Sequence, residues 1–365
     1  MPKRALVCLS GGVDSAVAAL LLKRAGYDVS TLTFWFWSFP NAPDYAGKTK
    51  CCALDTAALA ARELDVPHQE IDASDDFHEH VLVDYVKRYR AGQTPNPCGR
   101  CNRYLRFGRA LQYAKQHAFD FVATGHHVQK LAHADGSYSL TRGADPNKDQ
   151  TYFLYGLSQE DLACLEFPIG AMTKPEIVRL AKEAGLTAAE LPESQDLCFA
   201  VSGETAFLFS DIDLKPGPIL DLEGRELGQH RGLPNYTIGQ RRGLGIAATE
   251  PLFVLEVDPI RNALIVGPDR ALLRNGLEAH EASFISGKAP ADGTPLEAKI
   301  RYRSPAVPCL YKSSNESQFT IEFEEPQRAI TPGQLAVLYQ GDHLLGGGTI
   351  VHAFPEHPET VAERV

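Results

Sequence analysis

The chain has 365 residues, 44% of them hydrophobic, so it can bury more than one core, and we expect three domains. No apolar run approaches the ~20 residues that span a bilayer, and the N-terminal apolar stretch reaches a glycine turn too early for a signal peptide. These features predict a cytoplasmic protein with no membrane partner. The net charge of −10 argues, taken alone, against a polyanionic partner.

The basic residues, however, are unevenly distributed. A window from Lys87 to Lys115 contains no Asp or Glu, which predicts a local binding surface for phosphates. A solvated basic helix face is the alternative. The basic residues of the window are Lys87, Arg88, Arg90, Arg100, Arg103, Arg106, Arg109 and Lys115.

The first part of the chain alternates predicted strands and helices. Strands are expected at 4–9, 28–36, 68–71 and 121–124, and helices at 13–25, 55–64, 76–89 and 102–117. This order predicts an α/β fold with a parallel sheet covered on both faces, and ligands at the carboxyl ends of its strands. We assign residues 1–200 to this domain.

The composition of the sequence changes after about Cys198, where Gly, Pro and β-branched residues become more frequent. Residues 201–275 are predicted to form a small central domain of mixed structure. Residues 276–365 contain alternating segments at 297–302, 318–323 and 334–339, separated by turn signals, which predict a C-terminal β-barrel.

A glycine-rich motif, SGGVDS, lies between the first predicted strand and the first helix. Backbone N–H groups and the helix dipole make such a junction an anion site. The motif lacks the lysine of a Walker A loop, and a simple glycine turn is the alternative reading. SGGVDS resembles the PP-loop of the N-type ATP pyrophosphatases, which implies adenylation by ATP with Mg²⁺. The resemblance implies ATP contacts from Leu9, Ser10, Gly11, Gly12, Val13, Asp14, Ser15, Phe34 and Gly125.

Two of the eight cysteines are closely spaced, in the segment TPNPCGRCN. The prolines stiffen the approach, and Asn102 is expected to begin a helix. The thiols of Cys98 and Cys101, near a helix N-terminus and flanked by arginines, are expected to have lowered pKa values. Cys198 lies in ESQDLCF, where the α/β domain ends. We expect Cys8, Cys164 and Cys309 to be inert core residues, and we interpret Cys51 and Cys52 as structural, with a redox or metal role as the alternative.

Further motifs extend the resemblance along nearly the whole chain. SGGVDS, TPNPCGRCN, ATGHH, GADPNKDQTYFLYGLS, ESQDLCF, YTIGQRRGLGI, KIRYRSP and TPGQLAVLY follow the order found in the tRNA-specific 2-thiouridylases of bacteria and mitochondria. The resemblance implies that Cys198 carries a persulfide, that Cys101 is its partner, and that tRNA is the substrate. It implies tRNA contacts by Asn96, Pro97, Cys98, His126, Lys148, Asp149, Gln150, Arg301, Tyr302 and Gln334.

The resemblance also implies a reaction. ATP adenylates a flipped wobble uridine, sulfur passes from Cys198 to C2, and Cys101 closes a disulfide with Cys198. A cysteine desulfurase or a relay protein would supply the sulfur. Asp14 would position Mg²⁺ or the attacking groups, or would be an ordinary loop residue.

Some family members have Asp at the position of Cys98. The cysteine in this chain therefore leaves a second mechanism open. Cys98, Cys101 and Cys198 could together hold an iron–sulfur cluster. An ammonia-using synthetase and a tRNA-binding protein without catalysis are further alternatives; neither would need both the loop and the cysteines.

Overall fold

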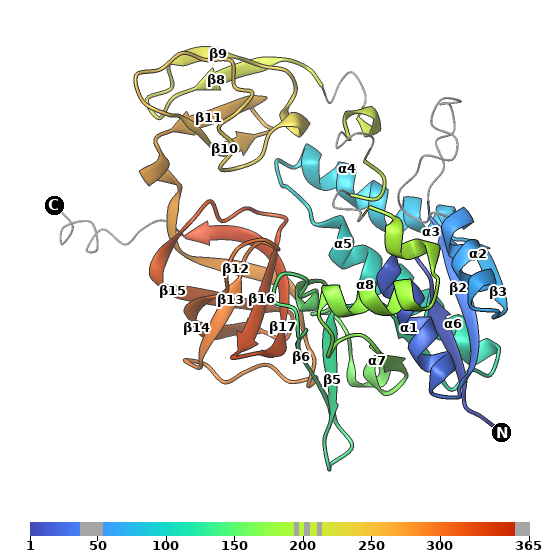
Figure 1. Ribbon diagram of the computed structural model, residues 1–365. Coiled ribbons are helices and arrows are strands. Elements are labelled where there is room, and N and C mark those ends of the chain that lie inside the picture. The colour runs from blue at the N-terminus through green and yellow to red at the C-terminus, as the bar shows by residue number, and fades with distance from the viewer. Residues whose placement is uncertain (37–53, 193–196, 201–204, 210–213, 355–365) are drawn as a thin grey trace.

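The computed structural model describes residues 1–36, 54–192, 197–200, 205–209 and 214–354, so Cys51 and Cys52 lie outside the described residues (Figure 1). The N-terminal part is built on a five-stranded sheet in the order β3-β2-β1-β4-β7, in which every pairing is parallel. Its strands are β1 (Arg4–Cys8), β2 (Asp28–Trp35), β3 (His68–Asp72), β4 (Phe121–Thr124) and β7 (Leu165–Glu166).

Helices cover both faces of this sheet, as the alternation of elements predicts. On one face, α1 (Val13–Arg24), α2 (Leu54–Glu63) and α8 (Lys174–Glu183) bury a core rich in Ala and Val. The other face packs an aromatic core against the helical segments between β3 and β4. Because α1 follows β1 directly, its N-terminus lies at the carboxyl end of that strand, and Gly26, at φ +85°, ends the helix.

The two helices predicted between β3 and β4 are each interrupted by a π-helical segment. The first consists of α3 (Ser74–Phe77), the π segment His78–Leu82 and α4 (Val83–Arg90). The second begins at Pro97, earlier than predicted, because Asn96 accepts a hydrogen bond from Gly99 N (3.2 Å) and acts as the N-cap. It consists of α5 (Pro97–Arg100), the π segment Cys101–Phe107 and α6 (Gly108–Gln116).

The central part is a small four-stranded sheet in the order β10-β11-β8-β9. It has its own core, which includes Ile219, Val254 and Leu264. Its strands are β8 (Gly217–Leu220), β9 (Glu226–His230), β10 (Phe253–Asp258) and β11 (Ala263–Gly267).

The C-terminal part is a six-stranded barrel, closed by the pairing of β12 with β17. Its strands are β12 (Leu273–Phe284), β13 (Pro295–Lys299), β14 (Val307–Asn315), β15 (Gln318–Arg328), β16 (Leu335–Gln340) and β17 (His343–Phe354). The hairpin of β5 (Val128–Ala132) and β6 (Tyr138–Arg142), which we did not predict, leaves the N-terminal part and pairs with β17 (Figure 1). Within the described part of the chain, no helix combines the length and apolarity needed to cross a bilayer.

Candidate active site

A cavity lies at the carboxyl end of β1, where the chain order reverses between neighbours β2 and β4. Such a switch point is the usual ligand site of an open parallel sheet. The predicted ATP contacts line this cavity, except Gly11 and Val13. The described residues that line it are Cys8, Leu9, Ser10, Gly12, Asp14, Ser15, Leu32, Phe34, Phe36, Arg106, Thr124, Gly125, His126 and Gln150.

The glycine-rich loop is held in a tight turn by its own side chains. Ser15 Oγ donates to Gly12 O (3.0 Å) and accepts from Ser10 N (3.1 Å). Gly11 has φ +79°, a conformation that favours glycine. A Cβ on Gly125 would lie 2.5 Å from Ser15 N, so only glycine lets the end of β4 approach the start of α1 this closely. The arrangement leaves the loop and the N-terminus of α1 facing the cavity, as an anion site requires.

Asp14, in the first turn of α1, is bound by a lysine that the sequence analysis did not identify. Lys174 Nζ, at the start of α8, lies 2.7 and 2.8 Å from the two carboxylate oxygens. Burial raises the pKa of Asp14, but the contacts of its carboxylate with His127 and Lys174 lower that pKa by a larger amount. The net shift is therefore downward. The carboxylate is therefore ionised and neutralised by Lys174.

His127 lies beside this ion pair and is almost wholly buried. Its Nε2 lies 3.3 Å from Asp14 Oδ1 and is close enough to lower the pKa of that carboxyl, but neither ring nitrogen makes a regular hydrogen bond with another described residue. Its backbone N–H donates to Gln150 Oε1 (3.0 Å). The second histidine of the ATGHH motif could have indicated His127 as a site residue, but we predicted a role for His126 alone.

His126 and Gln150, expected to contact tRNA, lie in the wall of the loop cavity. The Nδ1 atom of His126 shares a 2.8 Å hydrogen bond with Thr124 Oγ1. Burial and the nearby Arg106 lower the pKa of His126 to about 3, so this ring is neutral at physiological pH.

The three predicted site cysteines gather beside the cavity, and all are free thiols. Besides burial, which is the main cause, nearby Cys198 contributes to the raised pKa values of both Cys98 and Cys101, so the three thiols lie near one another. Our expectation of lowered thiol pKa values was wrong. Burial raises the pKa of Cys98 and of Cys101 to about 12, and Cys101 lies beyond the first turn of its helix, away from the N-terminal dipole. Nearby Arg106 opposes this rise in both.

The segment before Cys98 touches all three parts of the protein. Thr94 N donates to Pro332 O (2.8 Å), and Thr94 Oγ1 donates to Thr237 Oγ1 of the central part (3.2 Å). Gln334, expected to contact tRNA, donates from Nε2 to Thr94 O (2.9 Å). The β-barrel therefore directly contacts the segment that precedes Cys98.

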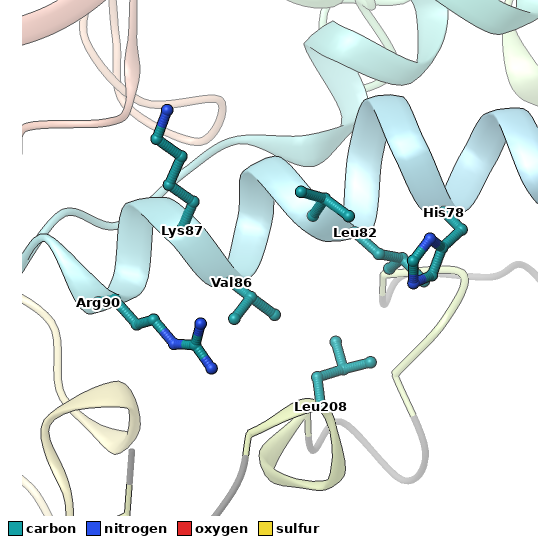
Figure 2. Close-up of a pocket in the computed structure, with 7 residues that line it drawn as sticks. His78, Leu82, Val86, Lys87, Arg90 and Leu208 are labelled. Atoms are coloured by element: carbon teal, nitrogen blue, oxygen red, sulfur yellow. The ribbon is translucent and has the colours of Figure 1, made fainter. Parts of the chain in front are cut away.

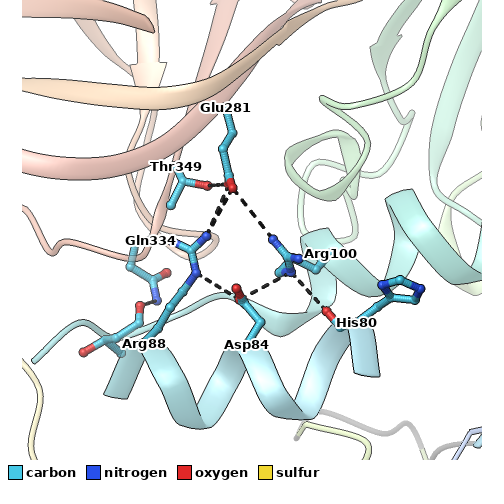
Figure 3. A network of polar contacts seen from close by, with 8 residues as sticks. His80, Asp84, Arg88, Arg100, Glu281, Gln334 and Thr349 are labelled. Atoms are coloured by element: carbon cyan, nitrogen blue, oxygen red, sulfur yellow. Dashed lines mark hydrogen bonds and ion pairs between the residues drawn. The ribbon is translucent and has the colours of Figure 1, made fainter. Parts of the chain in front are cut away.

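An ion-pair network continues this contact (Figure 3). Asp84 on α4 accepts from Arg88 Nε at 2.9 Å and lies 3.3 Å from Arg100 Nε. Glu281 of the barrel lies 3.3 Å from Arg88 and 3.9 Å from Arg100, and it accepts from Thr349 Oγ1 (2.9 Å). Glu281 has φ +55° in a bulge of β12, a strained conformation for a residue other than glycine. The predicted basic window is thus not a uniform phosphate-binding face, because Arg88 and Arg100 already bind carboxylates.

The remaining predicted tRNA contacts lie where the barrel meets the N-terminal part. Asp149 accepts from Thr151 Oγ1 at 2.8 and 2.9 Å, and Lys148 N donates to Asp145 O (3.0 Å). Tyr302 packs on Phe153, with ring centroids 4.5 Å apart. Arg301 donates to three oxygens, Ile238 O (3.0 Å), Ala329 O (3.0 Å) and Thr331 Oγ1 (2.6 Å), so its guanidinium ties the barrel to the central part.

The other described cysteines differ from one another. Cys309 is buried in the barrel core, as predicted, but Cys164 is exposed, because it follows the short helix α7 (Gln159–Ala163) at the edge of the sheet. Cys8 packs against the aromatic core and lines the loop cavity, and burial raises the pKa of its thiol to about 12, as expected of an inert residue. The prediction of a core residue was therefore wrong for Cys164. No group of three His, Cys, Asp or Glu side chains among the described residues is arranged to hold a metal ion.

A second pocket lies on the outer face of α4 and is separate from this site (Figure 2). Leu82, Val86 and Leu208 form its apolar floor, with Lys87 and Arg90 at its edge. Its walls contain none of the predicted site residues.

The parallel sheet, the loop at its switch point and the adjoining thiols define a PP-loop ATP-binding enzyme of the HUP class. The family described as the tRNA methyl transferase HUP domain matches residues 3–202. A PRC-barrel domain matches 205–268, and an aminomethyltransferase β-barrel domain matches 274–350.

Full-length relatives identify the family more closely. The tRNA-specific 2-thiouridylase MnmA of Chloroflexus aurantiacus is 43% identical, covering 94% of this chain and 97% of the relative. The enzyme of the same name from Moorella thermoacetica is 44% identical, covering 94% and 98%, and that from Magnetococcus marinus is 42% identical, covering 96% and 99%. The chain belongs to the tRNA-specific 2-thiouridylase family.

Proposed function

We propose that this protein is an ATP-dependent tRNA 2-sulfurtransferase that converts the wobble uridine of tRNA to 2-thiouridine, with AMP and pyrophosphate as coproducts. One observation carries the proposal: the helix that bears Cys98 and Cys101 also contributes Arg106 to the wall of the loop cavity. A nucleotide in the cavity and a base held by the cysteines would therefore be neighbours.

In the first half-reaction, the C2 oxygen of a flipped uridine attacks the α-phosphorus of ATP, and pyrophosphate leaves. The loop's backbone N–H groups after Ser10 and the N-terminus of α1 stabilise the departing pyrophosphate. Phe34 and Gly125 line the part of the cavity assigned to adenosine. Neutral His126 can donate or accept a hydrogen bond there without adding charge.

In the second half-reaction, the terminal sulfur of a Cys198 persulfide attacks C2. The C2–O bond breaks, and that oxygen leaves on AMP. The thiolate of Cys101 then attacks the Cys198 sulfur, the persulfide bond breaks, and 2-thiouridine is released with a Cys101–Cys198 disulfide. A dithiol reductant and a protein persulfide donor, either a cysteine desulfurase or a relay, restore Cys198.

We test the metal candidates against the donor groups. Asp14 is the one carboxylate among the described residues that line the cavity, and Lys174 binds both its oxygens, so a Mg²⁺ site on Asp14 does not fit this arrangement. The thiols of Cys98, Cys101 and Cys198 do not form a metal-holding group in this conformation. No step of the proposed reaction therefore passes through protein-bound Mg²⁺ or an iron–sulfur cluster.

We assign the tRNA to the side of the protein where Gln334 and Tyr302 of the barrel lie near the segment that contains Asn96 and Cys98. We include Lys148 as a further contact. Because Gln334 binds Thr94 O, a tRNA contact by Gln334 would act on the chain just before the target-base segment. We take residues 1–200, 201–275 and 276–365 as the working domain boundaries.

The proposal is tested by incubating the purified protein with ATP, a magnesium salt, an unmodified tRNA transcript, a cysteine desulfurase with cysteine as the persulfide donor, and a dithiol reductant. We expect AMP, pyrophosphate and 2-thiouridine in equal amounts, each dependent on tRNA. The absence of tRNA-dependent pyrophosphate would contradict the proposal, and an aminated base formed when ammonia replaces the persulfide donor would indicate the synthetase alternative.

A further inference from the structure

Arg106 belongs to the basic window that we interpreted as a phosphate-binding surface, but it lies inside the active site. It lines the loop cavity together with Gly125 and His126. The reason is the π-helical segment Cys101–Phe107 that carries it. In an α-helix, residues five apart point about 140° away from each other, whereas in a π-helix, with i to i+5 bonds, they lie on one face. The π segment therefore turns Arg106 toward the side of Cys101.

The electrostatics of the site agree with this geometry. Burial raises the pKa values of Cys8, Cys98 and Cys101, and Arg106 opposes this rise; burial and Arg106 together lower the pKa of His126. Arg106 therefore lies near all four groups, at the boundary between the cavity and the thiols. His126 is neutral, so among the described residues that line the cavity Arg106 alone carries a positive charge at neutral pH.

Both half-reactions develop negative charge at this boundary. The adenylated uridine carries the α-phosphate there, and the departing AMP gains a further charge as the C2–O bond breaks. Cys101 must lose its proton to attack the persulfide, although burial raises its pKa to about 12. A guanidinium suits both tasks, because its fixed fork of N–H donors matches phosphate oxygens and its charge does not titrate.

We propose that Arg106 is a catalytic residue of both half-reactions: it binds the α-phosphate of the adenylated uridine and stabilises the thiolate of Cys101. This inference rests on the proposed function and adds a residue that joins the nucleotide site to the sulfur site. In the second step the guanidinium keeps its protons, since it acts by charge and hydrogen bonding alone. The thiol proton of Cys101 passes to solvent or to the departing base.

The test compares Arg106→Gln and Arg106→Met with Arg106→Lys, and uses Arg109→Gln as a matched control. Arg109 lies on the following helix and binds Asp76 outside the cavity. With persulfide-loaded protein and tRNA, we expect the neutral variants to lower single-turnover thiolation and pyrophosphate release by roughly 100-fold. Thiolation in these variants should also rise at a higher pH than in the wild type. Arg109→Gln should stay within about twofold of the wild type.

Thiolation by Arg106→Gln within about threefold of the wild type at pH 7, with the same pH profile, would overturn the inference. If the neutral variants do not fold, Arg106→Lys decides. Its thiolation should fall above about pH 10, where lysine loses its charge, and a wild-type profile there would overturn the inference. Failure of the wild type and of Arg109→Gln to make 2-thiouridine would instead count against the proposed function.

Discussion

Replacing Lys174 with methionine should destabilise the N-terminal part of the protein and weaken ATP binding. The ammonium group lies 2.7 Å from Asp14 Oδ1, and the side chains of Lys174 and Asp14 are 12% and 31% exposed. At an effective dielectric constant near 20, a charge separation of ~4 Å corresponds to about 4 kcal/mol of attraction, part of which desolvation offsets. Breaking a fully buried pair costs about 3–5 kcal/mol; because Asp14 is partly exposed, we expect about 2 kcal/mol.

The effect should depend on pH in a defined direction. The pKa of Asp14 is lowered in the folded state: burial raises it, but the contacts with His127 and Lys174 outweigh burial. A carboxylate with a depressed folded pKa contributes stability above its unfolded pKa of about 4, and that contribution is lost as pH falls through the folded value. The difference between wild type and Lys174→Met should therefore be complete at pH 7 and shrink below about pH 4.

Thermal unfolding followed by circular dichroism measures this difference. For a domain of this size, 2 kcal/mol corresponds to a fall in Tm of about 4–8 °C. Lys182→Met is a matched control, because Lys182 is exposed in the last turn of the same helix, and its Tm should change by less than about 2 °C. Equal melting temperatures for the two variants at pH 7, with unchanged ATP affinity, would show that the Lys174–Asp14 ion pair does not stabilise the protein.

Three further substitutions separate the parts of the site. Cys198→Ser should release pyrophosphate with tRNA but form no 2-thiouridine, because adenylation and sulfur transfer use different groups; loss of both activities in a folded variant would contradict this. Cys98→Ala should keep much of the thiolation activity, since the disulfide pair does not include it. Iron bound in stoichiometric amount by the wild type and lost with activity in Cys98→Ala would establish the cluster alternative. Glu281→Gln should lower the free energy of unfolding by about 1 kcal/mol, because this carboxylate is 45% exposed, and should slow thiolation more than pyrophosphate release, since Arg100 loses one of its anchors. Equal slowing of both reactions would argue against a role of Glu281 in positioning α5, the helix that carries Cys98 and Arg100.

The α/β part of the fold could be predicted from local patterns. β4 matches its prediction, and β1 and β2 end within a residue of theirs, because buried parallel strands form short apolar runs bounded by glycine or turn residues. The hairpin of β5 and β6 could not be predicted in its place. Its position depends on the pairing of Leu140 with Leu344, which are far apart in the chain, and no local pattern contains that information.

The site was predictable as far as its motifs extend. SGGVDS identified the loop, and the cysteine motifs identified the thiols that the structure brings together. Lys174 comes from a helix that is distant in the sequence. Its one local signal is that it follows Thr173, which forms a capping box with Glu176. The capping box predicts the start of the helix but not the ion pair of Lys174 with Asp14. The pKa values of the thiols depend on burial, which the flanking arginines do not reveal.

Mass spectrometry of tRNA nucleosides from a strain that lacks this protein shows directly whether the protein makes 2-thiouridine. The proposed function predicts that 2-thiouridine derivatives disappear, that the wild-type gene restores them, and that the Cys198→Ser variant, expressed at the same level, does not. An unchanged amount of 2-thiouridine in the deletion strain, or full restoration by Cys198→Ser, would contradict it.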